Sequence, residues 1–199
     1  MRVAVLLIVL GVIAALGSGW PASSSSTDTA SRPVHVPRRE RRPAAPRGGL
    51  GEAGGAIPDG TTVFDGTVPG VAELDADLLA ALRRAATEAA ANGVRFTVDS
   101  GWRSPAYQEQ LLQQAVSKYG SEAEAARWVA TPQTSAHVKG EAVDLGSSGA
   151  TWLSAHGAAY GLCRIYGNEP WHYELRTEAV DHGCPPVYAD PTHDPRMQQ

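Results

Sequence analysis

Apolar residues recur at helical spacing most clearly over residues 75–91, where leucines and alanines return every three or four positions. Acidic side chains occupy the first turn of this segment and an Asn-Gly pair follows it, which is a typical start and stop for a helix. A second helix is predicted over residues 105–120 because proline is favoured in a first helical turn. Shorter helices are predicted over residues 121–129 and 151–160.

Four short segments have the composition or the alternation of strands: 94–98, 142–145, 164–166 and 171–175. In the last of them, apolar residues alternate with His172 and Glu174, which places these two polar side chains on one face. Helices come early in the chain and short strands come late. This order predicts an α+β fold with one small domain, in which helices flank an antiparallel sheet.

The N-terminal residues 1–20 contain a charge-free apolar run behind a single arginine. Such a run predicts either a secretory signal peptide or an N-terminal membrane anchor, since about 17–25 apolar residues span a bilayer. Neither cysteine lies near this run, which excludes attachment of a lipid to a cysteine there. Both interpretations place the rest of the chain outside the cytoplasm, in the cell wall or tethered to the membrane.

Composition divides the remainder of the chain into three parts. Residues 21–56 are rich in serine, proline and arginine and almost lack large apolar side chains, which predicts a disordered linker. Residues 57–185 contain the predicted helices and strands and form the expected domain. Residues 186–199 are rich in proline and predict a flexible tail.

Charge is unevenly distributed between these parts. Residues 51–199 hold ten basic and nineteen acidic residues, a net charge of −9, although the whole chain has a net charge of only −4. An acidic domain excludes nucleic acid as a partner. The six arginines of the linker fit a solvated spacer, or a contact with anionic lipids or wall polymers.

Cys163 and Cys184 are the only cysteines of the chain. In an exported protein the simplest interpretation is one disulfide, since oxidising compartments preserve such bonds. The closed loop contributes about 3 kcal/mol of stability in the chain-entropy model. This loop contains Glu169 and His172, so the bridge is expected to brace the segment that carries them.

The histidines and carboxylates that could bind a metal or transfer protons are concentrated in two stretches, residues 135–144 and 169–174. His137, Asp144 and His172 form a plausible set of three metal ligands. Three nitrogen and oxygen ligands leave a tetrahedral zinc ion with one open position for water, as catalysis requires. A carboxylate three residues before the second histidine is suited to take a proton from that water. The residues therefore predict a metal-assisted hydrolase.

The same residues form an ordered set of motifs: S-x-H-x-x-G-x-A-x-D at 135–144 and E-x-W-H-x-E at 169–174, preceded by S-G-W-R-S at 100–104. These motifs resemble those of the VanY-like zinc D-alanyl-D-alanine carboxypeptidases and dipeptidases of the M15 peptidase family. Trp102 stands where that family commonly has tyrosine, and it leaves the following arginine in register.

The resemblance implies a zinc ion in a central cleft, held by His137, Asp144 and His172. Glu169 would act as the general base, taking the proton of the attacking water and passing it to the departing amine. Together these four residues would form the reacting centre.

The resemblance also implies roles around the metal. Arg103 would face the oxyanion that develops on the scissile carbonyl, where a fixed positive charge helps most. Ser135 and Gln108 would hold the terminal carboxylate and the flanking amides of the substrate. Trp171 would pack beside His172, and Glu174 would fix the orientation of the His172 imidazole.

The implied function is hydrolysis of the terminal D-alanine of peptidoglycan stem peptides, by a protein expected to be a monomer. Export disfavours the free dipeptide as substrate, because that dipeptide is mainly cytoplasmic. Three alternatives remain: an endopeptidase on the same scaffold, a catalytically silent zinc-stabilised wall-binding module, and a non-haem iron oxygenase. Iron is disfavoured outside the cytoplasm, and an oxygenase gives no reason for Glu169.

Overall fold

The computed structural model describes residues 50–198. The predicted signal peptide or anchor and most of the predicted linker lie outside these residues and remain predictions. None of the helices within residues 50–198 has the length and hydropathy that a membrane-crossing helix needs.

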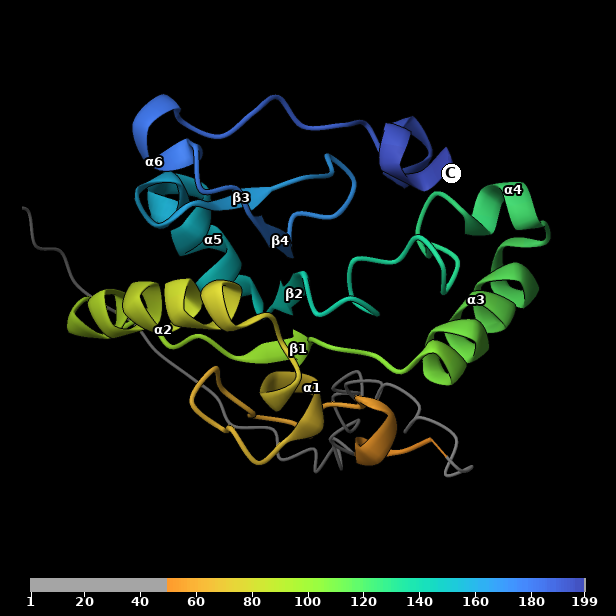
Figure 1. Cartoon of the computed structure of the whole chain (residues 1–199), viewed down its shortest axis with the longest axis horizontal. Helices are drawn as coiled ribbons and strands as arrows, with labels where there is room; N and C mark the ends of the chain where they lie inside the picture. Colours follow the sequence, from red (N-terminus) through yellow and green to blue (C-terminus); the bar gives the residue numbers. More distant parts are fainter. Residues whose placement is uncertain (1–49, 199) are drawn as a thin grey trace, which may run out of the picture. The chain divides into compact units, whose positions relative to one another are not determined.

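A four-stranded antiparallel sheet carries the site. Its strands are β1 (Val98–Ser100), β2 (Ala142–Leu145), β3 (Leu162–Arg164) and β4 (His172–Leu175), in the order β1-β2-β4-β3. The two central strands pair so that Asp144 lies opposite His172. This sheet and its helices confirm the predicted α+β domain (Figure 1).

Two helices pack on the sheet and against each other to form the main core. Helix α2 (Ala76–Ala91) begins at Asp75, whose side chain accepts hydrogen bonds from the amides of Asp77 and Leu78. Helix α5 (Ser147–His156) continues into the 3-10 turn η2 (Gly157–Tyr160). Their apolar faces bury leucine, alanine, phenylalanine and tryptophan side chains together with the sheet.

Helices α3 (Pro105–Tyr119) and α4 (Glu122–Ala125) pack together, away from α2 and α5 in Figure 1. Each begins at a serine whose hydroxyl accepts a hydrogen bond from a backbone amide in the first turn. The smaller elements are η1 (Glu52–Gly54), α1 (Pro69–Ala72), α6 (Ala179–His182), η3 (Pro191–His193) and η4 (Pro195–Gln198).

Several predicted ends of strands and helices were wrong, and for the strands the reason is the pairing with neighbouring strands. The strand predicted at 94–98 instead covers Val98–Ser100. Val98 pairs with Leu145, the last residue of β2, and the chain enters α5 soon after it, so the described residues before Val98 have no partner on β2. The strand predicted at 164–166 instead covers Leu162–Arg164, because these are the residues that pair with β4. The helix predicted at 151–160 begins four residues earlier and tightens to a 3-10 turn at its end.

Residues just before 57, the predicted start of the domain, contact the rest of the described structure. Gly54 accepts a backbone hydrogen bond from Ser104 through its carbonyl. Gly55 adopts φ +101°, and a Cβ there would lie 2.2 Å from the carbonyl oxygen of Trp102. Only glycine fits this close approach without strain, so the segment before residue 57 is part of the domain.

The residues predicted as a flexible tail contain local structure. Tyr188 forms a parallel β-bridge with Tyr166, and the last residues form η3 and η4. Asp190 and Asp194 are buried and engaged in ion pairs with arginines. Paired charges fix this proline-rich segment, although it lacks a large apolar face.

A disulfide joins Cys163 of β3 to Cys184, which follows α6. Reducing it is expected to lower the melting temperature by roughly 6–12 °C, because loss of about 3 kcal/mol in a protein of this size has that effect. Thermal melts with and without reductant, combined with thiol counting, measure this shift. Equal melting temperatures, with two free thiols in the untreated protein, would contradict the bridge.

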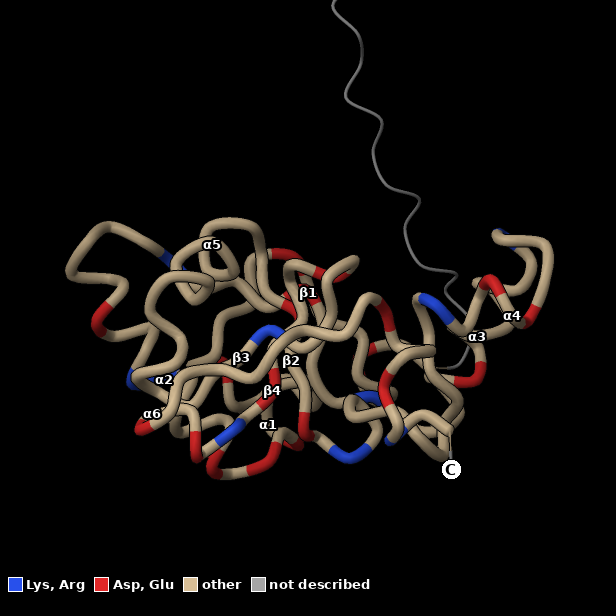
Figure 2. Tube along the Cα trace, turned by 90° about the horizontal axis from the view of Figure 1, so that it is seen from above, with Lys and Arg blue, Asp and Glu red and all other residues tan. Residues whose placement is uncertain are grey.

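Charged side chains are spread over the domain. Figure 2 shows acidic positions along the helices and loops of the described part, with lysines and arginines scattered between them. This distribution is that of an acidic domain, in keeping with the net charge of residues 51–199.

Candidate metal centre and active site

The structure brings together the three predicted ligands from separate parts of the chain. His137 lies in the loop before β2, Asp144 lies on β2, and His172 begins β4. Gly140 turns the loop into the strand with φ +75°, and a Cβ there would lie 2.6 Å from the carbonyl oxygen of Glu73. Glycine is therefore required where the chain delivers His137 to the sheet.

One donor atom from each of His137, Asp144 and His172 lies within 4.8 Å of the others. Asp144 Oδ1 is 3.5 Å from His137 Nε2 and 3.0 Å from His172 Nδ1. The other nitrogen of His137, Nδ1, is 2.8 Å from the carbonyl oxygen of Gly101. That hydrogen bond leaves the lone pair of Nε2 available to a metal ion. Two imidazoles and one carboxylate form a set of ligands that zinc commonly has in proteins.

Burial and charge favour the protonation states that metal binding needs at His137 and Asp144, whereas at His172 burial is outweighed by hydrogen bonds to Asp144 and Glu174, which raise the pKa to about 10. Burial lowers the pKa of His137, with a further contribution from the nearby Arg103 cation, and this favours neutral imidazole. Burial opposes ionisation of Asp144, but His137 and His172 outweigh it and hold the pKa of this carboxyl well below its usual range. Neutral imidazole and ionised carboxylate are the forms that coordinate metals.

Glu169 lies beside the three ligands in a pocket of about 220 Å³. Its Oε2 is 3.8 Å from His172 Nδ1, and the residue is buried. Burial raises the pKa of Glu169 to about 7. A carboxylate with such a pKa beside an open coordination position suits a general base at neutral pH.

Arg103 is fixed in this pocket by three side chains. Its Nη2 is 3.0 Å from Asp144 Oδ2, its Nη1 donates to Gln108 Oε1 at 3.1 Å, and its Nε donates to Ser100 at 2.8 Å. Asp144 therefore uses one oxygen toward the histidines and the other toward Arg103. The guanidinium both orients the aspartate and adds positive charge to the pocket.

Gln108 and Ser135, the two predicted substrate-binding residues, differ in the contacts that they make. Gln108 is buried, and both polar atoms of its amide have a partner: Oε1 accepts from Arg103, and Nε2 donates to the carbonyl oxygen of Ala130 at 2.8 Å. These contacts hold Arg103 in place, and Gln108 also lines the pocket. Ser135 is buried beside His137 and lines the pocket. Trp171, expected to pack, is 40% exposed and lines the same pocket.

Glu174 occupies the position predicted for a partner of His172. Its Oε1 is 3.4 Å from His172 Nε2, and the residue is 1% exposed. Burial would raise the pKa of Glu174, but hydrogen bonds from His172 and Arg196 outweigh it and hold this pKa well below the usual range. An ionised carboxylate on the far nitrogen of a ligating histidine fixes the ring and leaves Nδ1 toward the metal.

Some residues around the three ligands had no signal in the sequence. The Tyr166 ring lies 5.2 Å from the His172 ring, and its hydroxyl donates to Asp194 at 2.9 Å. Arg196 donates to Glu174 from the C-terminal turn η4. These residues lie outside the motifs, and no local pattern relates Tyr166 or Arg196 to His172, so only the folded structure shows them at the site.

Fold and site together define an α+β domain that gathers three potential metal ligands beside a buried carboxylate, a donor set that suits catalytic zinc. A family model described as VanY: D-alanyl-D-alanine carboxypeptidase matches residues 71–177. The chain belongs to this family, as the motifs predicted.

Individual relatives agree with this assignment. A curated D-alanyl-D-alanine carboxypeptidase of Enterococcus faecalis (strain ATCC 700802 / V583) is 33% identical over 111 residues, covering 43% of this chain and 41% of the relative. The solved structure of VanYB in complex with D-alanine-D-alanine is 29% identical with a TM-score of 0.50, covering 55% of this chain and 74% of that one. The LdcB LD-carboxypeptidase shares the fold at 23% identity and a TM-score of 0.51, covering 64% of this chain and 71% of that one.

Proposed function

We propose that this protein is a zinc-dependent carboxypeptidase that removes the terminal D-alanine from peptidoglycan stem peptides. The observation that carries the proposal is one pocket that unites His137, Asp144 and His172 with the carboxylate of Glu169. Membership of the VanY family and the D-Ala-D-Ala bound to the relative VanYB support the choice of substrate.

When bound, zinc supplies Lewis acidity that polarises a carbonyl and lowers the pKa of water. Glu169 then takes the proton of the attacking water and delivers it to the departing amine of D-alanine. Arg103, held by Asp144, Gln108 and Ser100, presents a fixed cation to the oxyanion that develops on the carbonyl. Burial keeps these groups largely out of water, so their charges interact more strongly than they would in solution.

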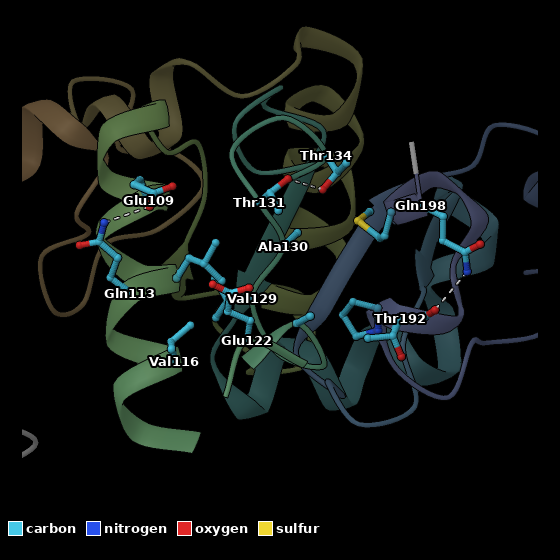
Figure 3. Close-up of a pocket in the computed structure, with 14 residues that line it drawn as sticks. Glu109, Gln113, Val116, Glu122, Val129, Ala130, Thr131, Thr134, Thr192 and Gln198 are labelled. Atoms are coloured by element: carbon cyan, nitrogen blue, oxygen red, sulfur yellow. Dashed lines mark hydrogen bonds between the residues drawn. The ribbon is translucent and has the colours of Figure 1, made fainter. Parts of the chain in front are cut away.

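A second and larger cavity, of about 600 Å³, extends away from the metal pocket. Figure 3 shows α3 with Glu109, Gln113 and Val116 on one side of it and Thr192 with Gln198 on the other. Both cavities are lined by the same four residues where they adjoin: Val129, Ala130, Pro191 and Met197. This continuity favours a substrate longer than a dipeptide.

The lining of the larger cavity suits a stem peptide. It is mostly apolar, and Glu109 and Glu122 are its only charged members among the described residues. Small aliphatic side chains and one cationic amine, as a stem peptide carries, match such a lining. We propose that the part of the stem before the scissile bond lies here.

Replacing Val116 with arginine is expected to raise KM for a stem pentapeptide several-fold, because the new side chain fills and charges the cavity. Cleavage of D-Ala-D-Ala is expected to stay within twofold of the unmodified protein. Steady-state kinetics with both substrates measure the difference. Gln114→Arg is the matched control, because it adds the same charge to α3 at an exposed position that does not line the cavity.

The same substrate series separates the carboxypeptidase from the endopeptidase alternative. Mass spectrometry of a pentapeptide digest is expected to show release of a single D-alanine. An intact pentapeptide, together with cleavage inside cross-linked wall fragments, would replace the proposal with an endopeptidase. Zinc binding without cleavage of either substrate would favour the binding module.

We place this reaction outside the cytoplasm, in the cell wall or at the membrane surface. The Cys163–Cys184 bridge supports that location, since disulfides persist in oxidising compartments. The substrate is a wall polymer, which supports it further. Tethering through residues 1–20 and the monomeric state remain predictions.

A further inference from the structure

We propose that Arg196 is a positioning residue of the metal centre, acting through Glu174 on the ligand His172. The inference rests on the proposed function. Arg196 lies in η4, beyond the residues 71–177 that match the family model. The C-terminal segment is therefore part of the site rather than an appendage.

Arg196 donates hydrogen bonds to the Glu174 carboxylate from two nitrogens. Its Nη1 donates to Oε2 at 2.7 Å and its Nη2 donates to Oε1 at 3.2 Å. Oε1 is also the atom that faces His172 Nε2 at 3.4 Å. A two-point guanidinium contact fixes the plane of a carboxylate, and here that plane sets the orientation of the imidazole.

Arg196 is itself held by a buried carboxylate. Asp194 is fully buried and accepts hydrogen bonds from Arg196 Nε at 3.0 and 3.1 Å. The Tyr166 hydroxyl donates to the same aspartate at 2.9 Å, while the Tyr166 ring lies against the His172 ring. A closed set of contacts thus runs from His172 through Glu174, Arg196, Asp194 and Tyr166 back to His172.

Charge balance explains why the arginine matters. Glu174 is 1% exposed, and a buried carboxylate is stable only when paired. Arg176 also donates to Glu174, but only to Oε2, at 2.6 Å. Without Arg196, only Arg176 holds the carboxylate, and it does so through Oε2, so Oε1, which faces His172, is no longer fixed. Loss of the direct partner of a ligating histidine typically weakens metal affinity about 10–100-fold, and loss of the group that fixes this partner is expected to reach the lower end of that range.

Arg127, which follows α4, provides a matched control because it also contacts the C-terminal segment. Its Nε donates to the buried Asp190 at 3.0 Å, so it anchors the C-terminal segment without contacting Glu174. Arg196→Met and Arg127→Met each remove one arginine that holds this segment. Only the first removes a donor to the partner of His172.

The test measures zinc affinity of the full chain by competition with a chromogenic chelator. We expect Arg196→Met to weaken zinc binding at least tenfold, Arg196→Lys to recover part of the loss, and Arg127→Met to stay within about threefold of the unmodified protein. The lysine restores charge but not the two-point contact. Equal affinities for Arg196→Met and the unmodified protein would overturn the inference, as would equal losses in the two methionine variants.

A double-mutant cycle keeps the inference testable if Arg196→Met folds poorly. Glu174→Gln keeps the shape of the side chain and removes its charge. If Arg196 acts through Glu174, the double variant binds zinc no more weakly than Glu174→Gln alone. Additive losses would overturn the inference. Failure of the unmodified protein to bind zinc would instead overturn the proposed function.

Discussion

Replacing Glu169 with glutamine is expected to leave zinc bound and to reduce kcat by about 10²–10⁴-fold. The Glu169 carboxylate is close to the metal ligands, with its Oε2 3.8 Å from His172 Nδ1. The amide keeps the size of the side chain but accepts no proton from water. Metal analysis and stem-peptide kinetics on the same preparation measure both expectations.

The metal content of this variant decides the role of Glu169. Stoichiometric zinc with lost hydrolysis identifies a base. Loss of zinc would make Glu169 a ligand, and retained hydrolysis would remove it from the reaction. Glu141→Gln is a suitable control, because Glu141 is an exposed carboxylate at an unspecified position of the motif 135–144 and lies outside the pocket lining.

Replacing His137 with alanine is expected to abolish both stoichiometric zinc binding and hydrolysis. Its Nε2 is one of three donor atoms gathered within 4.8 Å, and two remaining donors do not complete a catalytic zinc site. The loss of affinity is expected to exceed 100-fold, because removing even a partner of a ligand costs about 10–100-fold. Chelator competition and stem-peptide kinetics measure the two losses.

His156→Ala is the matched control for that experiment. His156 is an exposed histidine at the end of α5, beside Trp152 and outside the metal pocket. The control is expected to bind one zinc ion and to hydrolyse the stem peptide at a rate within twofold of the unmodified protein. Normal zinc content in His137→Ala would contradict the ligand assignment.

Local patterns predicted much of the fold. The helix α2 was predicted to within one residue because an aspartate cap and an Asn-Gly stop bound a clear apolar period. The strands were harder to place, since their bounds depend on pairing with distant segments. The shift of β3 to Leu162–Arg164 follows from its register against β4, which no local window contains.

The motifs also predicted which residues meet at the site. His137, Asp144, His172 and Glu169 converge in one pocket, as their types and order indicated. Glu174 was predicted from strand alternation, because His172 and Glu174 share a face.

Other contacts of the site depend on tertiary structure and had no sequence pattern. Substrate binding by Gln108 stays a prediction, and the sequence contained no pattern for the contacts of its amide with Arg103 and Ala130 across the fold. The C-terminal segment was expected to be flexible, since prolines and few apolar residues suggest no packing. Its order comes from ion pairs of Asp190 and Asp194 with arginines that are remote or late in the chain.

Zinc titration of the stripped enzyme tests the central claim most directly. The metal would be removed with a chelator, zinc returned in steps, and release of D-alanine from a stem pentapeptide followed by mass spectrometry. The account predicts no release without metal, and a rate that rises linearly to a maximum at one zinc ion per chain. Full activity in the stripped protein, or no D-alanine release at any zinc concentration, would contradict it.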